Sequence, residues 1–288
     1  MGRQHNSVRR KLAIATWRPP REANIYGKLE LDATEALAYL QQVRERSGER
    51  VTMTHLVARA TAAALAEEPT LNGRIRFGRY LPNDRVSIAF LVTMPDGSDL
   101  ARARVDDVDR KDLATIAAEL RSRSRRLRDG ADTDWEASKR IVRVLPTWLL
   151  RPLVWTTGWL TASLGIDAKP LGLERQPFGS AIVTSVGMLG LDEAWVPPTP
   201  FARVPLYVLI GAVRERPTTV EGQVVSRPML TVTATIDHRF IDGFQAATLA
   251  RAFRRVFDDP WSLDRAGGAP SVRASGGAQD PPLAPPSA

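Results

Sequence analysis

Residues 230–257 read LTVTATIDHRFIDGFQAATLARAFRRVF, and this stretch decides the fold. Its first part, Leu230 to Ile236, is rich in β-branched residues and predicts a buried strand. Its last part, Phe244 to Phe257, has apolar residues at helical spacing and predicts an amphipathic helix. His238 therefore lies in a short loop where a strand ends and a helix begins, and the carboxylate of Asp242 follows it by four residues.

His238 is the one histidine of three whose neighbours are suited to hold an imidazole in a single pose. A histidine that acts as a base must be neutral near pH 7, fixed in one tautomer and within hydrogen-bond reach of its proton. Asp242 could orient the loop by pairing with an arginine, and Gly243 lets the chain turn tightly into the helix. On these residues alone, a structural role is the favoured interpretation, because a lone histidine at a strand end is more often structural than catalytic.

The composition sets the class of protein. The chain has 288 residues, 43% of them hydrophobic, which suffices for one sizeable core and one or two domains. Its net charge of +8 comes almost entirely from arginine. Such a chain could meet phosphates, nucleic acid or an acidic membrane surface, or could simply have a basic solvated surface. Because the arginines are scattered and lack interleaved aromatic residues, we expect no nucleic-acid partner.

Several kinds of chemistry are excluded by what the sequence lacks. It has no cysteine, which excludes disulfides, thiolate zinc sites and cysteine nucleophiles. No cluster of histidines and carboxylates has metal-ligand spacing, so we expect no metal. Neither a G-x-S-x-G elbow nor a phosphate-binding glycine loop occurs. No apolar run of signal-peptide quality follows the basic N-terminus, so a cytoplasmic location is expected.

Alternating and helical patterns place one folded domain over residues 11–262, preceded by a basic arm at 1–10. Residues 263–288 are mostly Gly, Pro, Ser and Ala, a composition that predicts a disordered tail. Strands are expected at 24–31, 85–92, 180–185, 206–213 and 229–236, and helices at 32–46, 56–67, 110–128 and 244–257. The mixture of helices and strands predicts an α/β or α+β fold built on a single sheet.

An insertion-like segment, residues 131–176, contains an apolar stretch rich in tryptophan at 140–166. Its longest uncharged run, 152–166, is shorter than the roughly 20 residues of a membrane-spanning helix. One interpretation is a helical hairpin packed on the domain or in a subunit contact. The others are a hydrophobic lid over an acyl site and a contact with a membrane surface, assisted by Arg140, Arg143 and Arg151.

The loop 237–243 resembles the DHRxxDG signature of the dihydrolipoyl acyltransferases of 2-oxoacid dehydrogenase complexes, whose HxxxDG core is shared with chloramphenicol acetyltransferase. The segment GSAIVTSVGMLG at 179–190 is similar to the family's GxFTISNLGMxG strand. Further segments match the family in order: 53–72 with its Pro-x-Leu-Asn end, 86–92 with the following PDG, 109–113, 205–213 and 228–230. The resemblance covers roughly residues 10–130 and 177–260 and implies a chloramphenicol-acetyltransferase-like fold, a two-layer α+β sandwich with a mixed sheet and helices on one side.

The resemblance also implies a mechanism with coenzyme A or acyl-CoA as substrate. His238 would deprotonate a thiol, which attacks a thioester carbonyl, and the hydroxyl of Thr184, or of Ser185 as the next candidate, would stabilise the oxyanion. Asp242 would support the loop through an ion pair with Arg9 or Arg10. Structural roles at the site are expected for Arg239, Gly243 and Gly187. In such enzymes one chain of a trimer contributes the histidine and its neighbour the hydroxyl, so we expect a homotrimer or a larger homo-oligomer.

The chain also departs from the family pattern. No lipoyl domain and no peripheral-subunit-binding domain precede the resembling region, so we expect a stand-alone member that carries no covalent lipoyl group. The acyl acceptor could then be CoA, a thiol on a separate lipoyl or carrier protein, or another nucleophile. Two alternatives to a soluble acyltransferase stay open: a catalytically inactive trimeric scaffold of the same fold, and a membrane-associated acyltransferase.

Overall fold

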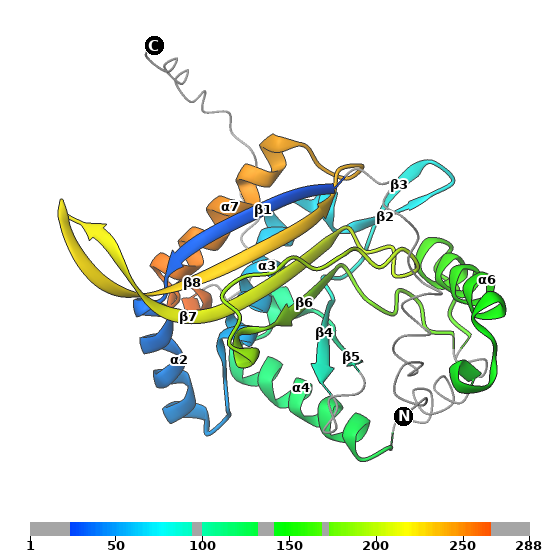
Figure 1. The fold of residues 1–288 in the computed structure, drawn as a ribbon, viewed down its shortest axis with the longest axis horizontal. Helices are drawn as coiled ribbons and strands as arrows, with labels where there is room; N and C mark the ends of the chain where they lie inside the picture. Colours follow the sequence, from blue (N-terminus) through cyan, green and yellow to red (C-terminus); the bar gives the residue numbers. More distant parts are fainter. Residues whose placement is uncertain (1–23, 94–99, 132–140, 169–172, 266–288) are drawn as a thin grey trace, which may run out of the picture.

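Six strands form one mixed sheet in the computed structural model, which describes residues 24–93, 100–131, 141–168 and 173–265 (Figure 1). In the sheet the order is β1-β8-β7-β6-β4-β5, and β6 runs parallel to both of its neighbours while all other pairs are antiparallel. The strands are β1 (Asn24–Asp32), β4 (Ile88–Thr93), β5 (Leu100–Val105), β6 (Ala181–Ser185), β7 (Leu206–Val220) and β8 (Gln223–Asp237).

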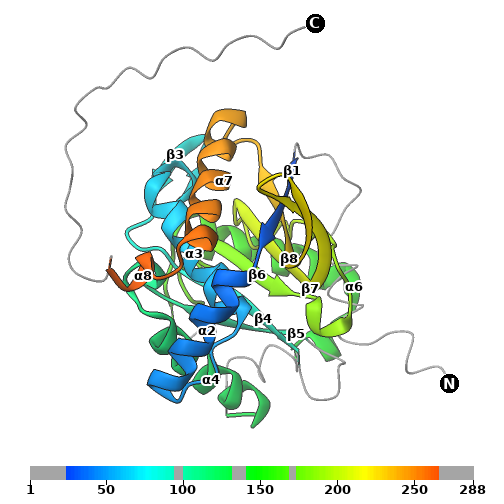
Figure 2. The ribbon, with the colours of Figure 1, turned by 90° about the vertical axis from the view of Figure 1, so that its left-hand side faces the viewer.

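Helices cover one face of this sheet, as predicted. Seen along the sheet's edge, α2, α3 and α7 lie together on one side (Figure 2). Alternate strand residues such as Ile88, Val183 and Val208 point into the core that these helices and α4 complete. The helices are α2 (Thr34–Ser47), α3 (Met53–Glu67), α4 (Leu113–Arg128) and α7 (Gly243–Asp258).

The opposite face of the sheet is covered by irregular chain. Ala89, Ile182 and Tyr207 point to this side and pack against Ala202 and Val204 from the segment between β6 and β7. The Tyr207 hydroxyl donates to the Thr199 carbonyl at 3.2 Å and so fixes that segment. This face therefore has a second, smaller core, whose residues alternate with those of the main core along each strand.

Part of the sheet was not predicted from the sequence. β7 and β8 continue beyond the expected strands into a two-stranded arm, 214–228, that projects from the sheet (Figure 1). Its residues are mostly polar, and its few valines do not form the regular apolar alternation that predicts a strand. β5 was missed for a related reason, because its buried positions include the small residues Ala101 and Ala103 between arginines. A separate hairpin, β2 (Gly73–Arg76) with β3 (Arg79–Pro82), was also missed.

The described chain continues past residue 262, the predicted end of the domain, and still packs on it. Ser262–Arg265 forms the short helix α8, in which Leu263 packs against the main core. The Tyr39 hydroxyl donates to the Asp264 carboxylate at 2.7 Å, and Arg46 forms an ion pair with the same carboxylate at 2.9 Å. The rest of the predicted tail and the predicted basic arm at 1–10 lie outside the described residues.

The tryptophan-rich segment is helical at 141–144 and, after a break at 145–146, again from Thr147 onward. α6 (Thr147–Gly158) continues directly into the π-helix η3 (Trp159–Ser163). Gly158 is required at this junction, since a Cβ there would lie 2.3 Å from the Phe201 carbonyl oxygen. In the described part of the chain, no helix has the length and apolar character needed to cross a bilayer.

His55 has a structural role at the start of α3. Its Nδ1 accepts a hydrogen bond from the backbone N–H of Thr52 at 2.9 Å, which completes a capping box. Burial lowers the pKa of His55 from 6.5 to about 4; the hydrogen bond with the Thr52 backbone opposes this in part, and the charge of Arg44 adds a smaller lowering. The folded protein therefore holds this histidine neutral at pH values where the unfolded chain protonates it.

We expect His55 to make the protein less stable in acid. The contribution of His55 to the free energy of unfolding is complete above pH 6.5 and is lost as the pH falls from 6.5 to about 4. This loss amounts to about 3 kcal/mol. His55→Gln keeps an acceptor for the Thr52 N–H but cannot titrate, so the free energy of unfolding should depend less on pH by that amount. Urea unfolding across this window measures the effect, and an unchanged pH dependence in the variant would contradict it.

Candidate active site

The loop that carries His238 is held by its own backbone and by the sheet. The Asp237 N–H donates to the Pro205 carbonyl at 2.9 Å, and the Phe240 N–H donates to the Asp237 carbonyl at 3.1 Å, which closes a turn around His238. The Asp237 carboxylate accepts from the Arg239 N–H at 3.0 Å and forms an ion pair with its guanidinium at 2.5 Å. Arg239 thus ties the loop to its own first residue.

The His238 side chain itself is exposed. Among the residues that the structure describes, no group forms a hydrogen bond with its imidazole. A ring that lies on a constrained turn and is exposed in the described structure is accessible to a substrate or to a second molecule.

Asp242 connects the loop to the following helix as the N-cap of α7. Its Oδ1 accepts from the Phe244 N–H at 2.8 Å, and its own N–H donates to the Gln245 side chain at 2.8 Å. Ile241, 3% exposed, anchors the same junction in the main core. The expected partners of Asp242, Arg9 and Arg10, lie outside the described residues.

Gly243 does not have the steric role expected from the sequence. Its φ is not in the left-handed region, and a Cβ at this position would meet no atom within 4 Å. The turn into α7 is made by the Asp242 cap, so a side chain at 243 would be tolerated within one copy of the chain. The open space above Gly243 lies at the exposed surface next to His238.

Phe240 is held from outside the loop by the β2–β3 hairpin. Its ring meets the ring of Tyr80 edge-on, with 6.3 Å between centroids. The Tyr80 hydroxyl in turn donates to the Pro69 carbonyl at 2.5 Å. A Cβ on Gly73 would lie 2.2 Å from the Tyr80 ring, so glycine at 73 makes room for it. No sequence pattern indicated this contact, since the hairpin itself was not predicted.

Thr184 and Ser185 lie at the end of β6, and both are partly exposed. The Ser185 hydroxyl approaches the Ile210 carbonyl at 3.5 Å. After the strand, the chain passes close to β7, where a Cβ on Gly187 would lie 2.5 Å from the Gly211 carbonyl oxygen. Glycine at 187 is therefore needed to bring the segment that follows Thr184 against the sheet.

The register of the sheet separates Thr184 from His238. Ala181, Leu206 and Ile236 lie in one row across β6, β7 and β8. Thr184 is three residues from this row in one direction, and His238 is two residues from it in the other. At the rise of a β-strand these five residues span about 17 Å, and the two intervening strand spacings add about 10 Å across the sheet. One copy of the chain does not bring the two side chains together.

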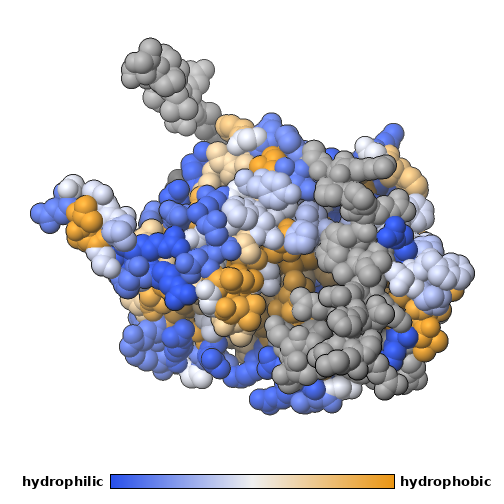
Figure 3. Space-filling model, in the orientation of Figure 1, coloured by the Kyte–Doolittle hydropathy of each residue, from blue (hydrophilic) through white to orange (hydrophobic). Residues whose placement is uncertain are grey.

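A patch of exposed apolar side chains follows Thr184. It consists of Met188, Leu189, Leu191 and Trp195, of which Met188 is 80% exposed and Leu189 71%. Figure 3 shows hydrophobic residues gathered near the middle of this face, over the segment between β6 and β7. Large exposed apolar side chains in a contiguous segment are typical of a protein–protein contact.

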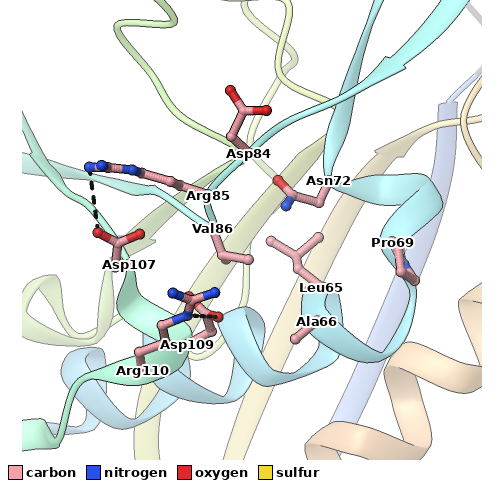
Figure 4. A pocket seen from close by; sticks show the side chains of 10 residues that line it. All are labelled: Leu65, Ala66, Pro69, Asn72, Asp84, Arg85, Val86, Asp107, Asp109 and Arg110. Carbon is pink, nitrogen blue, oxygen red and sulfur yellow. Dashed lines mark ion pairs between the residues drawn. The ribbon is translucent and has the colours of Figure 1, made fainter. Parts of the chain in front are cut away.

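A polar cavity of about 190 Å³ lies at the start of β4 and contains none of the predicted site residues. Leu65, Ala66 and Val86 line its apolar side, and ion pairs of Arg85 with Asp107 (3.6 Å) and of Arg110 with Asp109 (3.7 Å) line the other (Figure 4). Both arginines of the lining are therefore paired, and the third carboxylate, that of Asp84, forms an ion pair with Arg175 at 3.2 Å. Within the described ranges, no three histidine or carboxylate side chains are placed to hold a metal ion.

Comparison with known proteins identifies the family. The family model of the 2-oxoacid dehydrogenases acyltransferase (catalytic domain) matches residues 6–139 and 172–264. The interruption between these segments falls within the predicted insertion at 131–176. The chain is 25% identical over 224 residues to the dihydrolipoyllysine-residue succinyltransferase component of the mitochondrial 2-oxoglutarate dehydrogenase complex of Saccharomyces cerevisiae. That match covers 77% of this chain and 39% of the yeast protein, so the chain spans about two fifths of that relative's length.

Solved structures share the fold. A dihydrolipoamide acetyltransferase of Azotobacter vinelandii, studied for the catalytic role of a serine, a histidine and an asparagine, has a TM-score of 0.61 at 19% identity, covering 90% of this chain and 88% of that one. The cubic core of a pyruvate dehydrogenase multienzyme complex gives 0.61 at 18% identity, covering 89% and 87%. These likenesses confirm the predicted fold class. The chain belongs to the family of 2-oxoacid dehydrogenase acyltransferase catalytic domains.

Proposed function

We propose that the protein is an acyltransferase that moves an acyl group between coenzyme A and a thiol, with His238 as the general base. The observation that carries the proposal is His238 itself, an exposed imidazole on a hydrogen-bonded turn, in the DHRxxDG motif of an acyltransferase family. In the Azotobacter protein the asparagine studied follows the histidine by four residues, and Asp242 follows His238 by the same interval.

The imidazole of His238 carries out both proton transfers of the reaction. His238 takes the proton of the acceptor thiol, and the sulfur attacks the thioester carbonyl carbon to form a new C–S bond. The Thr184 hydroxyl, or that of Ser185, donates a hydrogen bond to the oxyanion of the tetrahedral intermediate. The original C–S bond then breaks, and the leaving sulfur takes the proton back from His238. Asp242, Arg239 and Gly187 contribute by positioning these groups.

The site is assembled from two copies of the chain in this proposal. His238 and Thr184 are too far apart in one copy to act on one substrate, so His238 of one copy faces Thr184 of its neighbour. The exposed apolar patch at 188–195 gives the neighbour a surface to cover. A closed ring of three is the smallest assembly that we propose, and the fold shared with a cubic multienzyme core supports such association.

The acceptor that fits this chemistry is a dithiol such as dihydrolipoamide, carried on a separate protein or another chain. Release of free CoA from acetyl-CoA or succinyl-CoA, measured with dihydrolipoamide as acceptor, tests the function. The expected result is saturable CoA release that requires the acceptor. Absence of acceptor-dependent release with acetyl-, succinyl- and branched-chain acyl-CoA would contradict the proposal.

Gly73→Ala is expected to lower kcat about tenfold with little change in KM. The added methyl group displaces the Tyr80 ring and so loosens its contact with Phe240, two residues from the base. Gly27→Ala is the matched control, because this strand glycine has nothing within 4 Å of its Cβ position. Steady-state kinetics with thermal unfolding of both variants measures the effect, and equal kcat values for the two would contradict a positioning role of Tyr80.

A further inference from the structure

The outer surface of α6 and of the turn before it exposes large apolar side chains. The side chains of Val144 and Trp148 are 77% and 73% exposed, and those of Ile141, Leu149 and Leu153 are 49%, 37% and 40% exposed. Trp148, Leu149 and Leu153 lie on α6, and Ile141 and Val144 lie on the helical turn just before it. We call this set, with Trp159 and Phe77, the apolar face of α6.

The opposite side of the segment is firmly packed, which fixes the orientation of this face. Leu150 is fully buried and forms a small cluster with Val142. At the end of α6, the contact of Gly158 with Phe201 holds the helix against the domain. The Phe77 ring from the β2–β3 hairpin meets Trp159 edge-on at 6.1 Å and extends the exposed apolar surface.

The charge of the segment indicates what covers this face. Residues 137–166 contain no aspartate or glutamate, but they contain Lys139, Arg140, Arg143 and Arg151. Arg143 is exposed beside Val144. A symmetric contact between two copies through this face would bring arginines together without a carboxylate to neutralise them. An anionic lipid surface offers both apolar depth for tryptophan and negative charge for arginine.

We propose that the apolar face of α6 binds the surface of anionic membranes, with the helix lying parallel to the bilayer. α6 and η3 together comprise 17 residues, about 25 Å of helix, which is shorter than a membrane-spanning segment. A surface-lying helix instead inserts its apolar side chains at the headgroup boundary, and nearby arginines bind the lipid phosphates. This mode of attachment is independent of the proposed acyl transfer.

Flotation with vesicles tests the proposal on the 288-residue chain. Vesicles of phosphatidylcholine alone are compared with vesicles that also contain phosphatidylglycerol. The wild type is expected to float with the anionic vesicles and to bind the neutral ones several-fold less. Trp148→Ser should lower the partition coefficient about tenfold, and Arg143→Gln about fivefold on anionic vesicles only. The matched control is Val224→Ser, at an equally exposed apolar position on the β7–β8 arm.

Three outcomes would overturn the proposal. Wild-type protein that stays in the soluble fraction with both vesicle types is one. Equal flotation of Trp148→Ser and Val224→Ser is another. The third is a change of molar mass by light scattering in Trp148→Ser without any change in flotation, which would assign the face to a contact between protein copies.

Discussion

Replacing His238 with alanine is expected to lower kcat for acyl transfer by about 10³-fold while leaving the thermal unfolding midpoint unchanged. A positioned general base contributes roughly 10² to 10⁴ in rate. The imidazole is exposed and has no hydrogen-bond partner among the described residues, so removing it costs the fold little. Free CoA release at saturating substrates, with circular dichroism melting on the same samples, measures both quantities.

His55→Gln is the matched control for this substitution. It removes a histidine that is 7% exposed and caps α3, and that has no part in the proposed reaction. We expect it to change the pH dependence of stability and to leave kcat at neutral pH as in the wild type. If His238→Ala kept more than a tenth of the wild-type kcat, His238 would not be the base. The alternative of an inactive scaffold predicts a different result, namely no acyl transfer by the wild type itself.

The sequence predicted the elements around the site because their patterns are strong. Leu230 to Ile236 is β-branched and buried on both faces, and α7 follows it with a regular apolar stripe. The cap of α7 was less accessible to sequence reasoning. Asp242 was expected to support the loop through an ion pair, but among the described residues its carboxylate binds the first turn of the helix. Both roles need a carboxylate at this position, so residue type alone does not separate them.

The contacts between elements distant in the chain could not be predicted. Tyr80 reaches Phe240 only because β2 and β3 form a hairpin, and its strands are short and interrupted by arginines. Gly73 looks like an ordinary glycine in the sequence, and only the structure shows that a side chain there would collide with the Tyr80 ring. These constraints depend on packing in three dimensions, which local periodicity does not encode.

The separation of Thr184 from His238 is also a property of sheet register. Their motifs show that both residues lie at strand ends. They do not show that the two strands end on opposite sides of the sheet along the strand direction. That follows from β6 and β7 being parallel while β8 is antiparallel to β7. It turns an expectation taken from resemblance into a geometric requirement: any site that uses both residues needs two copies of the chain.

Replacing Thr184 with valine should lower kcat by about 10²- to 10³-fold, because valine keeps the shape of threonine but cannot donate to the oxyanion. Thr184→Ser, which keeps a hydroxyl, should retain most of the activity. Ser185→Ala separates the two candidates. If Ser185 is the donor, the loss appears in that variant, and Thr184→Val is nearly as active as the wild type.

Mixing the two inactive variants tests the shared site directly. When His238→Ala and Thr184→Val chains are co-expressed in equal amounts and form closed rings at random, about a quarter of the sites combine an intact His238 with an intact Thr184 from the neighbour. Activity should therefore rise to about a quarter of the wild-type value. A site within one chain predicts no recovery, since every chain carries one defect. Mixtures that stay as inactive as the separate variants would exclude the two-copy site. That result would not contradict the acyltransferase function, which is tested on the wild type.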